Sequence, residues 1–336
     1  MKVSIALCTY EGARHLNDQL ASIGGQSRLP DEVVIHDDGS RDETARILRE
    51  FASNSPFPVH VEINHRQLGP MQNFEHAIRH CSGEVIALAD QDDVWHPEKI
   101  ARLEAALISS PEAGLVFSDA NVVDQYGRSL GYRAWEVLRF GQREQRLFRR
   151  GKAFRCLLWQ EFVMGASMAF RSSFRSLILP FPTLSGASGS AVLHDAWIAL
   201  AISAVAEITF VDDPLIEYRQ HSGQHCGLPA PKQAPRRLLP LRPSSSKNQR
   251  KSLVLQDLTR LRAIHNVLRG RTSGLDCSRA LFELQACERH LSARVALLER
   301  ERPRGRVALQ ELVSLRYHRH SRGLRSALGD LLAPEA

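Results

Sequence analysis

The stretch GEVIALADQDDVWHPEKI, residues 83–100, joins an apolar run directly to three carboxylates. The residues VIALA read as a buried strand, because they form a short apolar run bounded by turn residues. Asp90, Asp92 and Asp93 follow within a single turn. Pro97 then stands where proline is favoured, in the first turn of a helix. A strand, an acidic turn and a helix in this order predict an α/β protein with polar groups at a strand end.

The first 120 residues repeat this alternation of strands and helices. Short β-type runs are each followed by apolar residues at helical spacing, which is typical of a mostly parallel sheet covered by helices. Ser40 and Glu43 have the spacing of a capping box. We expect strands near 3–8, 33–35, 59–63, 85–89 and 115–117, helices near 16–23, 40–51, 74–78 and 97–109, and, after the alternation fades, a helix from 194 and short strands at 208–211 and 215–218.

Polar residues follow three of the predicted strands at the points where those strands end. The segments are Thr9 to Glu11, Asp37-Asp38 and Asp90 to Asp93. Open α/β sheets bind their ligands beyond the carboxyl ends of parallel strands, which lie at one edge of the sheet. We therefore expect these three segments to meet in one crevice.

The three carboxylates of the acidic turn favour a bound cation. A turn often holds aspartates because they accept hydrogen bonds from nearby backbone and cap the next helix, and for a lone pair that reading would suffice. Like charges packed this closely raise one another's proton affinity unless a cation lies among them. Mg²⁺ or Mn²⁺ suits the turn, since such ions take oxygen ligands and share one or two carboxylates with substrate phosphates. The pattern therefore indicates a substrate that carries a diphosphate.

The pair Asp37-Asp38 has two readings on the residues alone. As a structural turn it needs no ligand, because Ser40 by itself explains the start of the next helix. As a binding element, a carboxylate at a strand end can accept hydrogen bonds from a nucleotide base or a ribose hydroxyl. Both readings remain open.

Four ordered segments carry a family resemblance. They are SIALCTYE at 4–11, VVIHDDGSRDET at 33–44, NHRQLGPMQNFEHAI at 64–78 and GEVIALADQDDVWHPEKI at 83–100. In this order and spacing they resemble family 2 glycosyltransferases, over roughly residues 1–225, and the ADQDDVW form is similar to bacterial members often described as rhamnosyltransferases. The resemblance implies a GT-A fold, which is α/β with a mostly parallel sheet and flanking helices. It also implies inverting transfer of a sugar, with rhamnose as one candidate, from a nucleoside diphosphate sugar to an acceptor hydroxyl in cell-surface polysaccharide synthesis.

The resemblance assigns one group of residues to the nucleotide. It implies that Thr9, Glu11 and Asp37 contact the nucleoside, and that Asn64 and Gly69 shape the same pocket. The family typically has Asn at the position of Glu11, so this chain departs from the pattern there.

A second group of residues is assigned to the metal and the reaction. Asp90 and Asp92 match the two acids of the family's Asp-x-Asp motif, with Asp92 as the metal ligand and Asp90 nearer the ribose. Asp195 resembles the catalytic base, which would accept the proton of the acceptor hydroxyl, although on the residues alone it would be a helix cap. His221 resembles a histidine that some relatives place on the metal or the diphosphate. Gly165 resembles a residue that forms the floor of the sugar pocket. Asp93 receives no role from the family pattern, and a structural role remains open for it.

The composition is ordinary for a soluble globular protein, with 336 residues of which 43% are hydrophobic and 24% charged. The N-terminal stretch MKVSIALCTYEGARHL lacks the longer apolar region of a secretory signal. The most apolar window, 196–211, is too short and too interrupted to span a membrane. We therefore expect a cytoplasmic chain without a membrane-spanning helix.

The six cysteines indicate reduced, mostly buried thiols. They are scattered, with no Cys-x-x-Cys pair and no His/Cys cluster at zinc spacing. The cysteines therefore predict no metal site.

The composition changes sharply near residue 229. Residues 229–246 contain five prolines, three consecutive serines and four basic residues without an acid, which is typical of a linker. Helical stretches follow at roughly 247–302 and 305–332. We expect a GT-A domain at 1–228, the linker at 229–246 and a basic helical segment at 247–336.

The C-terminal part carries most of the positive charge. Residues 1–228 hold 22 Lys/Arg and 28 Asp/Glu, a net of −6, whereas residues 229–336 hold 22 and 9, a net of +13. This charge suits attraction to anionic lipid, at about 1 kcal/mol per basic residue near the surface. Because acceptors of the resembled family are often lipid-linked, we expect a glycan or lipid-linked acceptor and peripheral contact with the inner face of the membrane through 229–336. A solvated helical face, a lid and a dimerisation element are the alternatives, and nucleic acid is not expected because no aromatic residues interleave the basic ones.

Two other classes of function compete with the enzyme reading. A catalytically silent nucleotide-sugar-binding module would keep the crevice and act through its basic tail, but the presence of both Asp92 and Asp195 argues against it. A nucleotidyltransferase also uses carboxylate-bound Mg²⁺ on an α/β sheet. It would want a glycine-rich phosphate loop near the N-terminus, where CTYEGARHL offers a single glycine.

Overall fold

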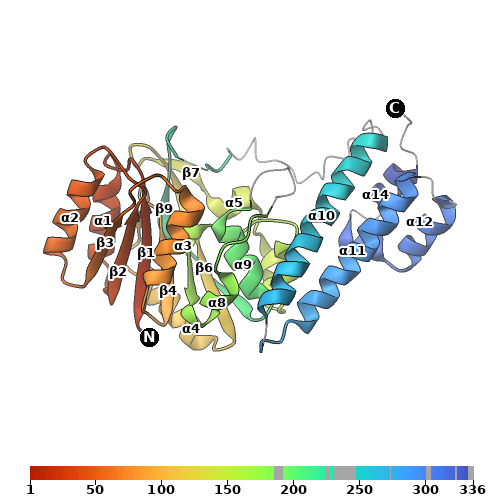
Figure 1. Cartoon of the computed structure of the whole chain (residues 1–336), viewed down its shortest axis with the longest axis horizontal. Coiled ribbons are helices and arrows are strands. Elements are labelled where there is room, and N and C mark those ends of the chain that lie inside the picture. The colour runs from red at the N-terminus through yellow and green to blue at the C-terminus, as the bar shows by residue number, and fades with distance from the viewer. Residues whose placement is uncertain are drawn as a thin grey trace. The chain divides into compact units, whose positions relative to one another are not determined.

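The computed structural model describes residues 1–184, 192–224, 227–229, 247–272, 274–299, 304–321 and 324–331. The chain splits into two compact units (Figure 1). We call Met1–Phe181 with Leu193–Ala234 the sheet unit, and Pro182–Val192 with Pro235–Ala336 the helical unit. Apart from residue 229, the linker expected at 229–246 lies outside the described residues.

The sheet unit is built on one mixed β-sheet. Among the described residues, its strands are β1 (Val3–Thr9), β2 (Glu32–Asp37), β3 (Val59–Ile63), β4 (Val85–Ala89), β5 (Val94–Trp95), β6 (Ala113–Asp124), β7 (Ser129–Arg133), β8 (Met168–Arg171) and β9 (Glu207–Gln220). Their order is β3-β2-β1-β4-β8-β6-β9-β5, with β7 paired to β6. The first four strands along this order are parallel, and antiparallel β8 joins them to β6.

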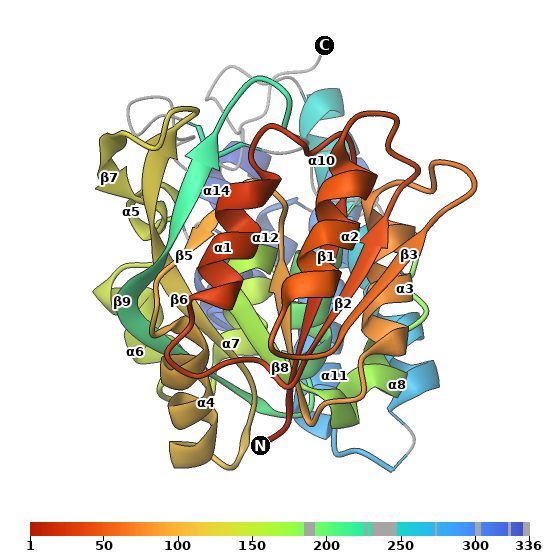
Figure 2. The same ribbon diagram turned by 90° about the vertical axis from the view of Figure 1, so that its left-hand side faces the viewer.

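Helices cover both faces of the parallel part. The helices of the sheet unit are α1 (Leu16–Gly24), α2 (Thr44–Asn54), α3 (Pro70–His80), α4 (Lys99–Ser109), α5 (Ala134–Leu138), α6 (Gln142–Phe148), α7 (Ala153–Leu157), α8 (Arg175–Ile178) and α9 (His194–Ser203), with short 3₁₀ helices η1 (Gly165–Ser167) and η2 (Ser172–Phe174). In Figure 2, α1 and α2 lie in front of β1 and β2, and α3 lies behind them. All seven residues of β1 are buried, as expected for a strand covered on both faces.

Strand alternation explains which side chains meet which helices. Ile5 and Ile35 share one hydrophobic cluster with Leu16 and Leu20 of α1. Because successive side chains of a strand point to opposite faces, His36 points toward the other face, which α3 covers. The helix α3 therefore packs over the face that carries His36.

The α/β prediction for the first 120 residues is confirmed, because its five strands and four helices all form. Three details differ from expectation. The capping box is wrong, since the Ser40 hydroxyl donates to Asp37 instead and α2 begins at Thr44. The two strands expected at 208–211 and 215–218 are one strand, β9, which continues through Pro214. Antiparallel β8 was not expected, because its four residues lack a strand-length pattern.

The chain reverses its strand order at β1, which makes the edge beside it the expected ligand crevice. From β1 the chain proceeds to β2 and β3 on one side and then to β4 on the other. In doubly wound folds, ligands bind at such a switch point, beyond the carboxyl ends of the strands. Thr9 is the register partner of Asp37, and Asp90 directly follows β4. The three polar segments therefore lie at one edge, as predicted.

The helical unit contains α10 (Lys247–Arg271), α11 (Ser278–Glu299), α12 (Arg304–Val313), α13 (Arg316–His320) and α14 (Leu324–Leu331). Helices form within both stretches expected at 247–302 and 305–332, and a turn with Gly274 at positive φ divides the first stretch into α10 and α11. None of the helices in the described part of the chain is long and apolar enough to cross a membrane. The described cysteines are free thiols, and all except Cys156 are buried, as expected.

A buried ion pair holds α14 against α11. The Arg294 guanidinium donates to both carboxylate oxygens of Asp330, at 2.6 and 3.1 Å, and the Tyr317 hydroxyl donates to the same carboxylate at 3.0 Å. All three side chains are buried. Without Asp330, the charge of Arg294 would be buried with no counterion. Removing one partner of the pair is therefore expected to cost more stability than the intact pair itself supplies.

Asp330→Asn is expected to destabilise the helical unit by about 3–5 kcal/mol, because it leaves Arg294 buried without a full counterion. Urea unfolding, monitored by hydrogen exchange of the backbone amides of α11, measures the loss of stability. Lys251→Met is the control, since Lys251 pairs with Glu299 at 2.5 Å where both side chains are about a third exposed. That change should cost less than about 1 kcal/mol, and an equally small effect of Asp330→Asn would contradict the expectation.

Candidate functional site

The Asp37 turn closes on its own hydrogen bonds. The Asp37 carboxylate accepts the Thr9 hydroxyl at 2.7 Å, the Ser40 hydroxyl at 2.6 Å and the Ser40 backbone N–H at 2.8 Å. Its side chain is fully buried. Thr9 and Asp37 therefore lie at the predicted edge, but in this structure they hold the turn and present no surface to a ligand.

Asp38 organises the loop that carries Asn64 and Gly69. Its carboxylate accepts the Asn64 amide at 3.0 Å and the backbone N–H groups of Leu68 and Gly69 at 2.7 and 2.8 Å. Gly69 has φ 84°, a left-handed conformation that glycine adopts without a steric cost, and it precedes α3. Asn64 also donates to Asn73. The loop predicted as a pocket wall is thus held at the strand edge through Asp38, which the sequence analysis assigned no role.

Glu11 braces the same turn from the end of β1. Its backbone N–H donates to the Ser40 hydroxyl at 2.8 Å, and its carboxylate accepts the Arg41 N–H at 2.9 Å. Its φ of 48° lies in the left-handed region, where Asn is several-fold enriched among residues with a side chain. The structure therefore gives Glu11 a bracing contact, and its carboxylate is turned to the backbone of the neighbouring loop.

Gln91 ties the acidic turn to the loop after β1. Its amide accepts from the Tyr10 N–H at 2.8 Å and donates to the Tyr10 carbonyl at 3.0 Å. A Cβ added at Gly12 would lie 2.2 Å from the Gln91 Oε1, so a side chain there would displace Gln91. The sequence analysis missed this clamp, because nothing in the local pattern marks Gln91 as facing β1.

The acidic turn brings Asp90 close to Asp92 and Asp195. Burial raises the pKa of Asp90 to about 7, and the neighbouring carboxylates of Asp92 and Asp195 add to the effect. A shift of this direction and cause is common where carboxylates face a functional site. The structure therefore brings together the acids that were predicted from separate segments, at 90–92 and at 195.

Asp92 meets His221 directly. The Asp92 Oδ2 and the His221 Nε2 are 2.7 Å apart. The Gly223 N–H donates to the other ring nitrogen, Nδ1, at 3.2 Å, so the Nε2 carries the proton and donates it to Asp92. The predicted pair is thus in contact, with both side chains mostly buried.

His15 is a third titratable group in this corner. Its ring centroid lies 5.0 Å from that of His221, and its buried Nε2 has no hydrogen-bond partner within the described residues. Burial lowers its pKa, and the nearby positive charge of Arg219 acts in the same direction. The sequence analysis missed His15, because it reads as the last residue before the apolar face of α1.

Asp93 has a structural role, which was left open on the sequence. It is fully buried and accepts the Arg219 backbone N–H at 3.0 Å, while the Arg219 guanidinium donates to the Asp92 carbonyl at 2.7 Å. Burial, followed by the charges of Asp92 and Asp90, raises the pKa of Asp93 well above its usual range. Asp93 and Arg219 therefore fasten β9, and with it His221, to the acidic turn.

A buried lysine lies beneath this turn. Lys99 is fully buried, donates to the Ala166 carbonyl at 2.5 Å and stacks its ammonium 3.4 Å from the centre of the Trp95 ring. Burial lowers its pKa well below the ordinary value, although Asp93 and Asp90 oppose that shift. Lys99 thereby links α4 to η1, the short helix that contains Gly165.

Asp195 and Gly165, which were expected beside the reacting sugar, lie in contact. The Gly165 N–H donates to the Asp195 Oδ2 at 3.1 Å, and the Ala196 N–H donates to its Oδ1 at 2.7 Å. A Cβ at position 165 would lie 3.0 Å from the His194 Nε2, so the close approach of η1 to α9 favours glycine there. Asp195 is partly exposed in the first turn of α9.

The donor set of the acidic turn fits a hard divalent ion. Asp92 is partly exposed at this turn and offers carboxylate oxygens, which are the ligands that Mg²⁺ prefers. Asp92, Asp90 and His221 do not form a three-donor set at ligand spacing among the residues that the structure describes. One or two protein ligands are what Mg²⁺ usually has when substrate phosphates and waters complete its shell.

The comparison with known proteins agrees with this architecture. The model of Glycosyl transferase family 2 matches residues 4–177. An uncharacterized glycosyltransferase of Nostoc sp. is 30% identical over 116 residues, 34% of this chain and 36% of that protein. The undecaprenyl-phosphate 4-deoxy-4-formamido-L-arabinose transferase of Pseudomonas fluorescens is 33% identical over 136 residues, 40% of this chain and 38% of that protein. The chain thus spans little more than a third of the length of these curated relatives.

A solved structure shows the same fold over nearly the whole chain. TarS 1–349 of S. aureus in complex with UDP-GlcNAc has a TM-score of 0.50 at 15% identity, over 97% of this chain and 90% of that chain. At this identity the likeness shows the fold alone, and the predicted GT-A fold with a C-terminal helical extension is confirmed. Asp195 and His221 lie beyond the residues that the family model matches.

Proposed function

The chain belongs to glycosyl transferase family 2, and on that basis we propose that it transfers a sugar from a nucleoside diphosphate sugar to an acceptor hydroxyl, with inversion at C1. The observation that carries the proposal is that Asp195 lies close enough to Asp90, at the ligand edge of the sheet, for its charge to raise the Asp90 pKa, while Asp92 follows in the same turn. A base and a metal-binding acid are the two groups that such a displacement needs at one place.

Asp195 is the proposed base. Its Oδ2 accepts one N–H, from Gly165, and keeps a second lone pair for the acceptor hydroxyl. As the hydroxyl oxygen forms its bond to C1 of the sugar, its proton passes to Asp195, and the bond from C1 to the diphosphate breaks with its electron pair on the leaving group. The hydroxyl becomes acidic only as the new bond forms, so an ordinary carboxylate suffices.

Asp92 and His221 are the proposed residues for Mg²⁺ or Mn²⁺, with Asp90 beside the ribose. When bound, the ion would offset the negative charge on the leaving diphosphate. His221 must give up its Nε2 proton to ligate, and the hydrogen bond from Gly223 to its Nδ1 opposes the tautomer that results. We therefore assign the first contact to Asp92 and expect His221 to join it when the 221–224 turn adjusts.

The nucleotide contacts are proposed for the turn network. Thr9, Asp37 and Glu11 hold the turn, and Asn64 and Gly69 form the loop beside it. Because Asp37 is buried, a nucleoside would reach it only after the Ser40 side chain moves. Gly165 is proposed to floor the sugar pocket beside Asp195.

The donor sugar is tested by screening nucleotide sugars. Rhamnose is one candidate, and two relatives carry other sugars in their names: the Pseudomonas fluorescens transferase named above, for 4-deoxy-4-formamido-L-arabinose, and an abequosyltransferase of Salmonella typhimurium. We expect one class of donor, among dTDP-rhamnose and the common UDP- and GDP-sugars, to raise the melting temperature and to be hydrolysed slowly when Mg²⁺ or Mn²⁺ is present. Failure of every donor with either ion would contradict the proposed function.

A glycan or lipid-linked acceptor is proposed, with the basic helical unit contacting the inner face of the membrane. The net charge of +13 over 229–336 supports this docking. Exposed apolar side chains in the same unit support it as well, among them Phe282, Leu309 and Val313, of which 61–75% of the surface is exposed. Basic and apolar groups on one unit are the combination that binds an anionic bilayer surface.

Vesicles that contain anionic lipid are therefore expected to carry the full-length chain upward in a flotation gradient, whereas neutral vesicles are not. Raising the salt from 0.1 M to 1 M should release the chain, because the screening length falls from about 10 Å to about 3 Å. Equal flotation with both kinds of vesicle, or none with either, would contradict docking by charge. The helical unit would then be a lid or a dimerisation element.

A further inference from the structure

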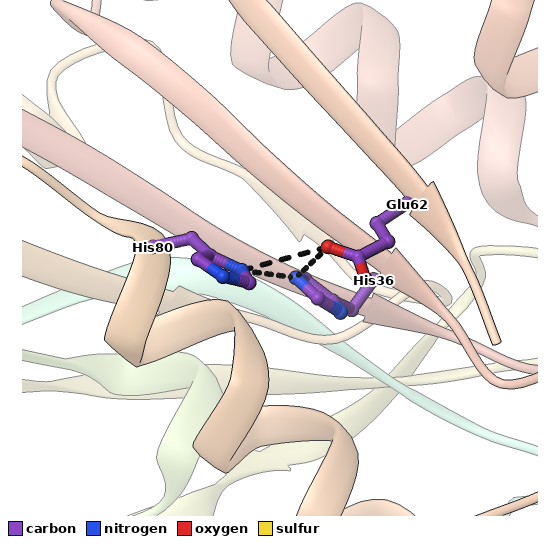
Figure 3. Close-up of side chains that lie close together, drawn as sticks. All are labelled: His36, Glu62 and His80. Carbon is purple, nitrogen blue, oxygen red and sulfur yellow. Dashed lines mark hydrogen bonds and ion pairs between the residues drawn. The ribbon is translucent and has the colours of Figure 1, made fainter.

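Two histidines and a glutamate meet on the face of the sheet that α3 covers, apart from the acidic turn. His36 lies on β2, Glu62 on the neighbouring edge strand β3, and His80 at the end of α3, and their ring nitrogens and carboxylate point toward one another (Figure 3). They are the set of three His, Cys, Asp or Glu side chains in the described part of the chain that could hold one metal ion. No role in the proposed reaction falls to any of them.

The three donor atoms are spaced like the ligands of a tetrahedral ion. The His36 Nε2 lies 3.0 Å from the His80 Nδ1 and 3.5 Å from the Glu62 Oε2, and the His80 Nδ1 lies 3.6 Å from the same oxygen. Zinc bonds of about 2.0–2.1 Å to nitrogen and oxygen give a tetrahedral edge of about 3.3–3.4 Å. The three observed distances lie on either side of that value, so one ion fits with small side-chain adjustments.

The fold holds two of the three donors in place. His36 and Glu62 are register partners in the parallel pair β2–β3, so their side chains leave the sheet on the same face. His36 is 1% exposed, and the Asn73 amide of α3 donates to its carbonyl at 2.8 Å. His80 and Glu62 are more than half exposed, which leaves the cluster open to solvent on one side. An ion therefore has both a fixed anchor and a path of entry.

The hydrogen bond between the two rings leaves the Glu62 carboxylate of this cluster without a proton from either ring. Only one proton can lie between the His36 Nε2 and the His80 Nδ1, and the nitrogen without it accepts that hydrogen bond, so neither nitrogen donates to the Glu62 Oε2, which lies 3.5 and 3.6 Å away. Burial lowers the pKa of His36 to about 4, the charge of Glu62 opposes that shift, and the neighbouring rings of His80 and His76 add to it. A divalent cation would take the place of the shared proton and bind both rings together with the Glu62 carboxylate, and neutral imidazole is the form that binds metal.

We propose that His36, Glu62 and His80 bind a divalent ion of the zinc class, with water in the fourth position. Two imidazoles and one carboxylate favour zinc over Mg²⁺, which prefers oxygen ligands. The Nδ1 of His36 is buried without a hydrogen-bond partner among the described residues, and such outer partners are worth about 10–100-fold in affinity. The site should therefore bind zinc more weakly than a site with a complete outer shell.

The bound ion would clamp the exposed edge of the sheet. It joins the edge strand β3 to β2 and to the end of α3. Two of its ligands lie close to residues proposed for the nucleotide, since His36 directly precedes Asp37 and Glu62 stands two residues before Asn64. Binding to the folded state alone stabilises it in proportion to the logarithm of the free ion concentration. Zinc should accordingly raise the melting temperature of the chain whether or not a sugar donor is present.

Zinc alone, titrated calorimetrically into the metal-free full-length chain, tests the proposal. His80→Ala and Glu62→Gln each remove an exposed donor, and each should weaken the strongest zinc site by at least about tenfold. His60→Ala is the matched control, because His60 is an exposed histidine two residues before Glu62 on the same strand. Its affinity for zinc, and that of Asp92→Asn, should equal that of the unchanged chain.

Cobalt gives a second readout, since its visible absorption is intense in a tetrahedral site and weak in an octahedral one. We expect the intense band in the unchanged chain and in His60→Ala, and its loss in His80→Ala. The proposal is overturned if no saturable zinc site exists, if His80→Ala and Glu62→Gln leave the affinity unchanged, or if Asp92→Asn removes the site and His80→Ala does not. None of these results depends on sugar transfer, so the two proposals fail separately.

Discussion

Asp195→Asn is expected to lower sugar transfer by about 10²–10⁴-fold while donor binding persists, because it removes the proposed base and no ligand of the metal. The asparagine carbonyl can still accept the Gly165 N–H, so the contact that holds η1 to α9 survives. Turnover with the donor found by screening measures the first effect. Calorimetric titration of that donor, with Mn²⁺ present, measures the second.

The control for this change is Asp213→Asn, because Asp213 is an exposed residue of β9 that pairs with Arg102 of α4. It alters the charge equally and should leave both measurements unchanged. Transfer that survives in Asp195→Asn would move the base elsewhere. Loss of donor binding together with transfer would instead make Asp195 a structural residue, and a wild-type chain that binds donor without any turnover would favour the silent binding module.

The convergence of the acidic segments could be predicted because it follows from topology. Asp37 and Asp90 each follow a buried strand, and parallel strands with helical crossovers place such residues at one edge whatever the side-chain details are. Asp195 is different, since it comes from a helix after a stretch where the strand pattern fades. The family resemblance, and no pattern in the residues themselves, pointed to it.

The side-chain clamps of the site could not be predicted in the same way. Lys99 reads as an ordinary charged position in the first turn of a helix, where lysines are usually exposed. It is buried because the Ala166 carbonyl and the Trp95 ring come from segments that only the tertiary fold brings to it. Gln91 and Asp38 are similar cases, because each binds backbone groups of a loop that is distant in sequence.

The histidine cluster had a sequence signal that was overlooked. His76 and His80 are four residues apart on α3, which places two imidazoles on one helix face, and the ring of His76 lies 5.7 Å from that of His36. Zinc motifs that can be recognised in a sequence usually combine cysteines with histidines at fixed spacing, which this sequence lacks. Of the three residues in the cluster only His80 lies on α3, and His36 and Glu62 meet it through the register of β2 and β3.

The neighbouring carboxylates of the acidic turn differ in exposure, and this difference allows a sharp test of the metal assignment. Asp93 is buried and accepts the Arg219 backbone N–H, and burial raises its pKa well above the usual range. Asp92 is partly exposed and faces His221. Two neighbouring aspartates thus offer nearly the same substitution with opposite expected results.

Asp92→Asn is expected to abolish transfer and to weaken metal-dependent donor binding by more than about tenfold, since even outer partners of a metal contribute 10–100-fold. Asp93→Asn should leave donor binding within about twofold, because the change keeps the acceptor for the Arg219 N–H. Calorimetry of the donor, with Mn²⁺ and again with a chelator, separates the metal-dependent part of the affinity. Full donor affinity in Asp92→Asn would contradict the metal assignment, and a loss confined to Asp93→Asn would move the metal to the buried side of the turn.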